Sequence, residues 1–234
     1  MRVLGIVPAR AGSKRIPRKN VADLGGRPLV AWAIDAARAA KTLTRVVVSS
    51  DDPEVLELAR AIDPRLALPR PPELSADDSP AIDYLRHAIL ATEAQGDAPW
   101  DATCIIQPTS PFTTAEDIDA VVTLCDRSGA DAAVSVMPVD HAMHPIKFKR
   151  LEGDRLLPLI EDERGRVMAS QLPKVFVRNG SVYVSRRTAV EAGDLLGRDC
   201  RGHVMPLDRS LDVNEPLDLD FARFLLARLG PTSR

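Results

Sequence analysis

The 234-residue sequence predicts an α/β domain built on a mostly parallel sheet. Short runs of apolar and β-branched residues, such as 3–7 and 45–50, alternate with longer segments whose apolar residues recur at helical spacing. The connections between these segments are short, as is typical of parallel strands joined by right-handed helical crossovers. Because no internal repeat or low-complexity linker interrupts the sequence, we expect a single domain over 1–234 with one insertion at about 138–173.

The composition is that of an ordinary globular protein, with 45% apolar and 27% charged residues. A net charge of −2 provides no general attraction to nucleic acid or to a membrane surface. No apolar run reaches the roughly 20 residues that a membrane helix needs, and the N-terminus leads into a predicted strand instead of a signal peptide. We therefore expect a cytoplasmic protein that binds neither nucleic acid nor a membrane.

The first predicted strand, 3–7, is followed by a loop rich in positive charge. Its five cationic side chains are those of Arg10, Lys14, Arg15, Arg18 and Lys19. Open α/β sheets bind ligands at the carboxyl ends of their strands, and cations at that edge suit a polyphosphate. A solvated basic turn is the alternative. The stretch 12–14, Gly-Ser-Lys, lacks the spacing of a Walker motif.

The next segments continue the alternation of strands and helices. We expect a helix from Leu29 to Ala40, a strand over 45–50 and a second helix that begins at Pro53. Asp51 and Asp52 lie between the strand and the second helix. Capping of that helix explains these two carboxylates better than metal binding does.

A third helix and a fourth strand follow. Ser79 is expected to cap the helix, Pro80 to begin it and Leu90 to point inward. The strand covers 102–106 and ends in the stretch 107–111, a loop stiffened by two prolines. Because this loop and the basic loop lie at the same predicted sheet edge, they can share one ligand.

The second half of the chain begins with the same pattern. A helix is expected from Ala115 to about Arg127, with Thr114 and Asp117 as a capping box, and a strand over 132–136. The alternation then breaks from Pro138 to Pro173. A break of that length is expected to build something of its own, here a small hairpin extension used in dimerisation.

Three further features lie near the C-terminus. The runs 175–177 and 181–184 predict a hairpin if they pair with each other. A last helix begins at Pro216 and is expected to turn five apolar side chains inward, those of Leu217, Phe221, Phe224, Leu225 and Leu229. Asp212 supplies a carboxylate that can hold magnesium together with nucleotide phosphates. The residues alone thus predict metal-dependent nucleotidyl transfer, without naming the nucleotide.

Five stretches of the sequence resemble, in order, motifs of the acylneuraminate cytidylyltransferases, the CMP-sialic acid synthetases. They are 9–20, 70–74, 107–111, 179–183 and 210–212. The resemblance implies a Rossmann-like three-layer α/β/α nucleotidyltransferase fold. It also implies that CMP is transferred from CTP to the anomeric hydroxyl of a sialic-acid-like nonulosonic acid, a 2-keto sugar acid, giving the CMP-sugar and pyrophosphate.

The same resemblance implies roles for individual residues. Those expected to bind the nucleotide are Arg10, Ser13, Lys19, Asn20 and Arg70. Those expected to contact the sugar acid are Gln107, Lys147 and Tyr183. Mg²⁺ is expected at Asp212 and Asn214, and the expected catalytic residues are Arg10, Lys19 and Asp212. Family members are commonly homodimers in which the inserted segment reaches over the partner's active site.

Two departures from the family pattern concern the acid and the metal. Asn214 stands where members that act on N-acetylneuraminate often carry a second aspartate, and 169–173 lacks an arginine that binds the sugar carboxylate. Lys147, Arg166 and Arg178 are the candidates to replace that arginine. Legionaminic or pseudaminic acid therefore stands beside N-acetylneuraminic acid as a possible substrate. The alternatives are an enzyme that activates the eight-carbon acid Kdo and a nucleotide-binding protein with weakened catalysis.

Overall fold

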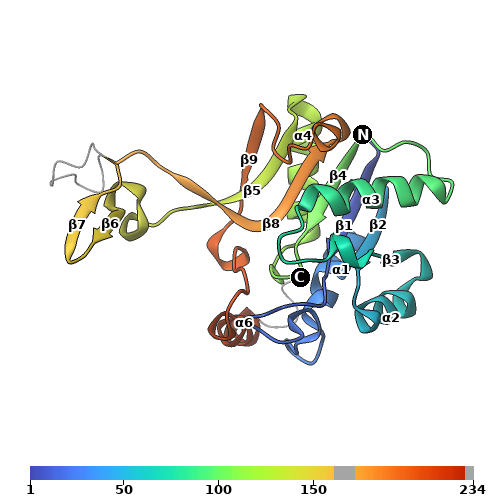
Figure 1. Ribbon diagram of the computed structural model, residues 1–234, viewed down its shortest axis with the longest axis horizontal. Helices are drawn as coiled ribbons and strands as arrows, with labels where there is room; N and C mark the ends of the chain where they lie inside the picture. The colour runs from blue at the N-terminus through green and yellow to red at the C-terminus, as the bar shows by residue number, and fades with distance from the viewer. Residues whose placement is uncertain (161–171, 230–234) are drawn as a thin grey trace.

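The computed structural model describes residues 1–160 and 172–229, and these form a mixed sheet flanked by helices (Figure 1). The described sheet has seven strands in the order β3-β2-β1-β4-β8-β5-β9. They are β1 (Val3–Pro8), β2 (Arg45–Ser50), β3 (Ala67–Pro69), β4 (Ala102–Ile106), β5 (Ala132–Pro138), β8 (Phe176–Arg186) and β9 (Cys200–Val204). Within this sheet β8 runs antiparallel to β4 and β5, and the other neighbouring pairs are parallel. The predicted mostly parallel sheet is confirmed.

Helices cover both faces of the sheet, which confirms the three-layer prediction. One face packs against α1 (Leu29–Ala39), α2 (Pro53–Ile62) and α4 (Ala115–Ser128). The other face packs against α3 (Ala81–Ala94) and α5 (Arg187–Ala192). Alternate residues of β1 join the two cores, because successive side chains of a strand point to opposite faces. Val3 lies in the first core, and Leu4 and Ile6 lie in the second.

The helix caps agree with the sequence in part. Thr114 and Asp117 form the predicted capping box of α4. Asp52 caps α2 by accepting a hydrogen bond from the backbone N–H of Glu54 at 2.9 Å. The prediction for Ser79 is wrong, because Pro80 occupies the N-cap of α3 and the Ser79 hydroxyl donates to the carbonyl oxygen of Glu73.

Two predictions about helix faces are also wrong, the second of them in part. Leu90 of α3 is 64% exposed, since the packed face of that helix is set by Leu85 and Ile89. The last helix, α6 (Pro216–Leu229), exposes Leu217, Phe221 and Phe224. It packs through Leu219 and Ala222 in one cluster with Ile16 of the basic loop, and Leu225 is partly buried against this cluster, as predicted. The burial of the Leu229 side chain lies outside what the structure describes. Apolar residues lie on more than one side of α6, so the periodicity alone did not identify its buried face.

The predicted hairpin over 175–184 is also wrong, because 176–177 and 181–184 belong to the single strand β8. Neighbours on either side, β4 and β5, pair with this strand. Its register against β5 shifts where Val134 pairs with Tyr183 and Val136 pairs with Arg178. Gly180 has a φ of 78° within this bulge. The Asn-Gly pair, a typical turn sequence, therefore serves a β-bulge here.

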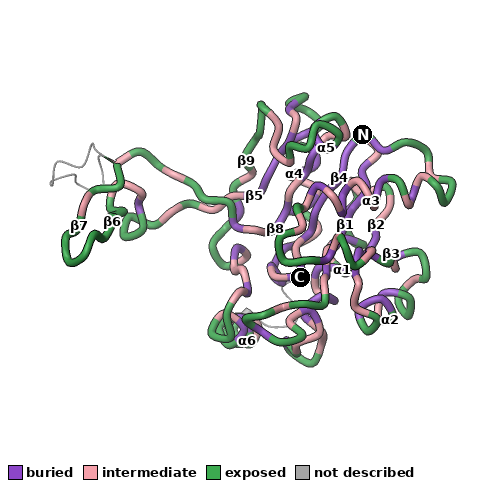
Figure 2. Tube along the Cα trace, viewed as in Figure 1, coloured by how far each residue is buried: buried purple, intermediate pink, exposed green. Residues whose placement is uncertain are grey.

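The insertion leaves the body of the molecule as an arm. Beyond the ends of β5 and β8 it carries the antiparallel hairpin of β6 (Lys149–Glu152) and β7 (Arg155–Pro158). Figure 1 shows this arm projecting from one side of the sheet, and Figure 2 shows that most of it is exposed. Among the described residues, no helix combines the length and the apolarity that spanning a membrane requires.

Candidate functional site

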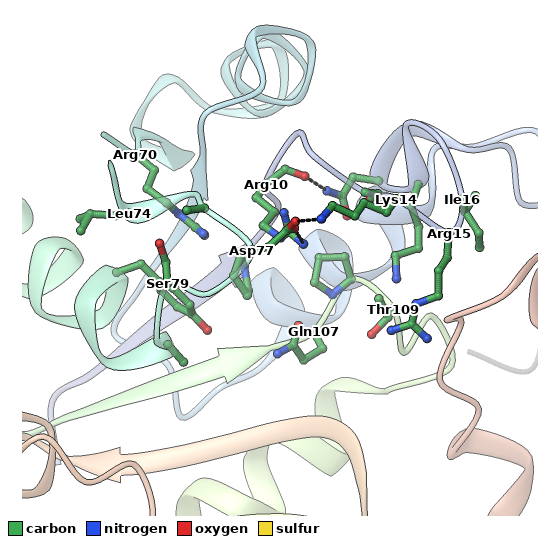
Figure 3. A pocket seen from close by; sticks show the side chains of 18 residues that line it. Arg10, Lys14, Arg15, Ile16, Arg70, Leu74, Asp77, Ser79, Gln107 and Thr109 are labelled. Atoms are coloured by element: carbon green, nitrogen blue, oxygen red, sulfur yellow. Dashed lines mark hydrogen bonds and ion pairs between the residues drawn. The ribbon is translucent and has the colours of Figure 1, made fainter. Parts of the chain in front are cut away.

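A cleft of about 530 Å³ opens beyond the carboxyl ends of β1 and β4 (Figure 3). Its walls come from the basic loop after β1, the segment from Arg70 to Tyr84 and the loop after β4. Six residues predicted to bind substrate line this cleft: Arg10, Ser13, Lys19, Asn20, Arg70 and Gln107. The basic loop and the loop after β4 therefore meet at one place, as the sequence predicted.

Hydrogen bonds to its backbone hold the basic loop in shape. The N–H of Ala11 donates to Asp51 Oδ1 at 2.9 Å, and Asn20 Nδ2 donates to the carbonyl oxygen of Arg10, also at 2.9 Å. Asp51 thus braces this loop, although the sequence suggested helix capping. Ile16 anchors the middle of the loop in the cluster beneath α6. The cations are therefore presented on a preorganised loop.

An acidic residue that the sequence analysis missed faces two of these cations. Arg10 Nη2 lies 2.7 Å from Asp77 Oδ1, and Lys14 also forms an ion pair with Asp77. Figure 3 shows both cationic side chains pointing at this carboxylate. The contacts with Lys14 and Arg10 lower the pKa of Asp77. Asp77 therefore balances charge on the side of the cleft where the basic loop lies.

Lys19 connects the basic loop to the segment that carries Asp212. Its Nζ donates to the carbonyl oxygen of Val213 at 3.0 Å. Burial lowers the pKa of Lys19, and the nearby Asp212 carboxylate opposes that shift. Arg15 also lines the cleft and pairs with Glu215 at 3.1 Å, whereas Arg18 pairs with Glu54 and does not line it. The charges of the loop are thus divided between the cleft and the outer surface.

Arg70 is a buried cation in the opposite wall. Its Nε donates to Ser49 Oγ at 3.0 Å and its Nη2 donates to the Ser49 carbonyl oxygen at 2.8 Å. The guanidinium carbon lies 4.4 Å from the centre of the Tyr84 ring, a cation–π contact. Burial lowers the pKa of Arg70. Tyr84 of α3, to which the sequence assigned no role, thus helps to fix a cation beside the cleft.

Asp212 has one carboxylate oxygen that suits a cation. Its Oδ2 accepts a hydrogen bond from Asn214 Nδ2 at 2.8 Å, whereas its Oδ1 is buried and has no hydrogen-bond partner among the described residues. An anionic, unpaired oxygen fits Mg²⁺, which takes oxygen ligands from few carboxylates and completes its shell with phosphates and water. No group of three or more His, Cys, Asp or Glu side chains in the described part of the chain could hold a metal. Asn214 contacts Asp212 directly.

Two of the residues predicted to contact the sugar acid lie outside the cleft. Tyr183 is half-buried on β8, where burial raises the pKa of its hydroxyl and the charges of Arg178 and Asp212 act on it. Lys147 ends a short 3₁₀ turn of the arm (Pro145–Lys147), and its Nζ lies 3.2 Å from His141 Nδ1. One chain therefore does not bring Lys147 to its own cleft. Arg166 and the stretch 169–171 lie outside the described residues.

The sequence offered little to identify the missed residues. Lys14 was expected only as one of five cations of the basic loop, without a role of its own, and it lines the cleft with Arg10. Asp77 and Thr109 also line the cleft. Asp77 lies in an irregular segment, and Thr109 lies in the loop between Pro108 and Pro111. Neither Asp77 nor Tyr84 shares a local pattern with the basic loop, because tertiary folding alone brings them together.

The curated proteins that are similar to this chain include a synthase and cytidylyltransferases named for sugar acids. It is 28% identical to a CMP-N,N'-diacetyllegionaminic acid synthase of Legionella pneumophila, over 93% of each chain. It is 25% identical to a pseudaminic acid cytidylyltransferase of Campylobacter jejuni, over 96% of each. An N-acylneuraminate cytidylyltransferase A of Danio rerio is 29% identical over 97% of this chain, which spans 51% of that longer protein.

Comparison with solved structures supports the fold. A CMP:2-keto-3-deoxy-manno-octonic acid synthetase, solved as a complex with CTP, superposes with a TM-score of 0.72 at 20% sequence identity. The match covers 97% of this chain and 99% of that one.

The cytidylyltransferase family model matches residues 4–155, which include the basic loop, Arg70 and the loop after β4. The chain therefore belongs to the cytidylyltransferase family and is an enzyme of that class.

Proposed function

We propose that this enzyme transfers CMP from CTP to the anomeric hydroxyl of a nonulosonic acid and releases pyrophosphate. The observation that carries the proposal is the gathering of Arg10, Lys19 and Arg70 around one cleft, with Asp212 beside Lys19. Relatives whose names specify legionaminic, pseudaminic and N-acylneuraminic acids support the class of acid. The synthetase for 2-keto-3-deoxy-manno-octonic acid, which is Kdo, is similar in fold at lower sequence identity, so Kdo is kept as the alternative substrate.

In the proposed reaction the chain acts mainly through positioning and charge. The hydroxyl oxygen of the acid attacks the α-phosphorus and loses its proton to solvent, and the bond from that phosphorus to the bridging oxygen of the β-phosphate breaks. Negative charge then grows on the departing pyrophosphate. Arg10, Lys14 and Lys19 of the basic loop neutralise that charge, and Arg10 and Lys14 exchange their ion pairs with Asp77 for the phosphates. Ser13, which lines the same cleft, is proposed to contact the triphosphate, and Asn20 and Arg70 are proposed to hold the base.

We propose that Mg²⁺ binds at Asp212. The buried, unpaired Oδ1 supplies one anionic ligand, and triphosphate oxygens supply others. When bound, the ion supplies Lewis-acid stabilisation of the phosphates. Lys19 is linked to Val213 by a hydrogen bond, so triphosphate binding at Lys19 and ion binding at Asp212 act on the same segment.

The acid is proposed to bind beside Gln107, with Tyr183 near the pocket and Lys147 supplied by a second copy of the chain in a homodimer. The arm exposes Leu151, Leu156 and Leu159, each by more than half of its surface. An isolated two-stranded hairpin is at best marginally stable in water, and exposed apolar side chains such as these indicate an interface. In a two-fold dimer both arms would be covered and both sites would be completed alike. We place the reaction in the cytoplasm, where CTP is made.

A pyrophosphate-release assay with CTP, Mg²⁺ and a panel of 2-keto sugar acids tests the proposal. Turnover with N-acetylneuraminic, legionaminic or pseudaminic acid is the expected result and identifies the substrate. Turnover with Kdo alone would replace the proposed substrate by the alternative. CTP binding without turnover of any acid would contradict the proposed activity and favour a nucleotide-binding protein, the alternative that Asn214 motivates.

A further inference from the structure

A buried polar network lies behind Asp212, and the proposed reaction does not use it directly. Asn179 of β8 is 3% exposed, Ser135 of β5 is 1% exposed and Ser210, two residues before Asp212, is 5% exposed. Ser135 Oγ donates to Asn179 Oδ1 at 2.6 Å, and Asn179 Nδ2 donates to Ser210 Oγ at 2.9 Å. The amide of Asn179 thus joins two strands of the sheet to the segment that carries Asp212.

The two serine hydroxyls that flank the Asn179 amide also form hydrogen bonds with the backbone. Ser135 Oγ accepts from the backbone N–H of Val182 at 2.9 Å, and Ser210 Oγ donates to the carbonyl oxygen of Pro206 at 2.8 Å. The second proton of Asn179 Nδ2 points to Met205 Sδ at 3.2 Å. A fully connected buried network fixes the geometry of its members, because breaking one bond leaves a buried polar group without a partner.

The segment from Met205 to Val213 is fixed at both ends. The N–H of Met205 donates to the carbonyl oxygen of Val136 at 2.8 Å, and the N–H of Val213 donates to that of Thr109 at 2.7 Å. Asn179 adds an anchor inside this span, at Ser210. Asp212 therefore lies between two anchored residues.

The residue after Asn179 completes the seat of Asp212. A Cβ atom built on Gly180 would lie 3.1 Å from Asp212 Oδ2, closer than an ordinary van der Waals contact. The positive φ of Gly180, 78°, is also one that side chains with a Cβ rarely adopt. The Asn-Gly pair thus has two tasks in one bulge: Asn179 holds the segment and Gly180 leaves room for the carboxylate.

We propose that Asn179 is a positioning residue for the reaction, which acts through Ser210 to hold the Asp212 carboxylate where it binds the metal ion with CTP. The inference rests on the proposed magnesium site. Groups that orient a metal ligand commonly change metal affinity by about 10- to 100-fold when they are removed. Asn179 needs no contact with either substrate to have such an effect.

The test measures CTP binding by calorimetry in the absence of the acid, once with EDTA and once with Mg²⁺. The Kd in EDTA divided by the Kd in Mg²⁺ reports how much the ion strengthens CTP binding, and its measurement requires no turnover. We expect Asn179→Ala and Ser210→Ala to reduce this ratio about tenfold or more and to leave the Kd in EDTA within about twofold of wild type. Ser185→Ala is the matched control, because Ser185 is a buried serine of the same strand whose hydroxyl donates to Leu195 instead.

The outcomes separate this inference from the proposed function. If wild-type protein shows no effect of Mg²⁺ on CTP binding, the proposed metal site fails and the inference fails with it. If Asp212→Asn abolishes the effect while Asn179→Ala and Ser210→Ala keep it, Asn179 does not position Asp212. A loss of CTP affinity in EDTA equal to the loss in Mg²⁺ would show a merely structural role. Should Asn179→Ala fail to fold, the smaller change Ser210→Ala decides.

Discussion

The nucleotide side of the site is built within one chain, whereas the proposed acid side is divided between the cleft and the arm. Arg10, Lys19 and Arg70 lie around one cleft, and each has a polar contact that holds it there. Lys147 lies on the arm and contacts His141. In the proposed dimer the nucleotide site therefore belongs to one chain, while the acid site takes Lys147 from a second chain.

The largest expected effect is at the centre of the nucleotide side. Arg10→Ala should lower kcat/KM for CTP by about 10²- to 10³-fold, because the growing phosphate charge loses a fixed partner. Pyrophosphate release measures this effect. Arg18→Ala is the control, since Arg18 belongs to the same loop but pairs with Glu54 away from the cleft. Equal losses in the two variants would mean that the loop acts only through its total charge.

The next largest effect should be on binding of the acid, without a change in CTP binding. Lys147→Ala is expected to raise KM for the acid by roughly 10- to 100-fold, as the loss of a charge-assisted hydrogen bond predicts. Calorimetry should show unchanged CTP binding. Arg150→Ala serves as the control, because Arg150 is a cation of the same arm that pairs with Glu152 at 2.8 Å. An equal loss of CTP affinity would contradict the proposal that Lys147 serves the acid site alone.

Gly180→Ala is expected to slow turnover about tenfold at limiting Mg²⁺, because the added methyl group displaces Asp212. Gly129→Ala is a close control: its φ is 70°, similar to that of Gly180, but a Cβ there meets nothing within 4 Å. Both variants should lose roughly 1–2 kcal/mol of unfolding free energy through backbone strain. If thermal unfolding and magnesium dependence change equally in the two variants, Gly180 has no special relation to Asp212.

The smallest expected effect is a gain. Asp77→Asn should lower KM for CTP by about two- to fivefold, since an exposed carboxylate no longer competes with the triphosphate for Arg10 and Lys14. The gain should shrink as salt is added, because salt screens exposed charges. Asp78→Asn removes the same charge one residue away and should change KM little. An increase in KM for Asp77→Asn would instead assign Asp77 to CTP binding.

The sequence predicted the fold and the meeting of the basic loop with the loop after β4, because both depend on local patterns. Buried strands, helix periodicity and a basic loop after β1 suffice to bring Arg10 and Gln107 to one sheet edge. It did not predict that Asp77 faces Arg10, since tertiary folding creates that contact. The Asn179-Gly180 pair was misassigned to a hairpin because the pairing of β8 with both β4 and β5 depends on distant strands.

Mixing Arg10→Ala with Lys147→Ala protein tests most directly whether each site combines Arg10 of one chain with Lys147 of the other. If the arm completes the partner's site, a mixed dimer has one site with both residues intact, and randomly mixed chains should recover about a quarter of wild-type turnover. The subunits are exchanged by co-expression, and mass spectrometry confirms the mixed dimers. Activity that stays at the average of the two variants would contradict the account and show that each chain holds its own complete site.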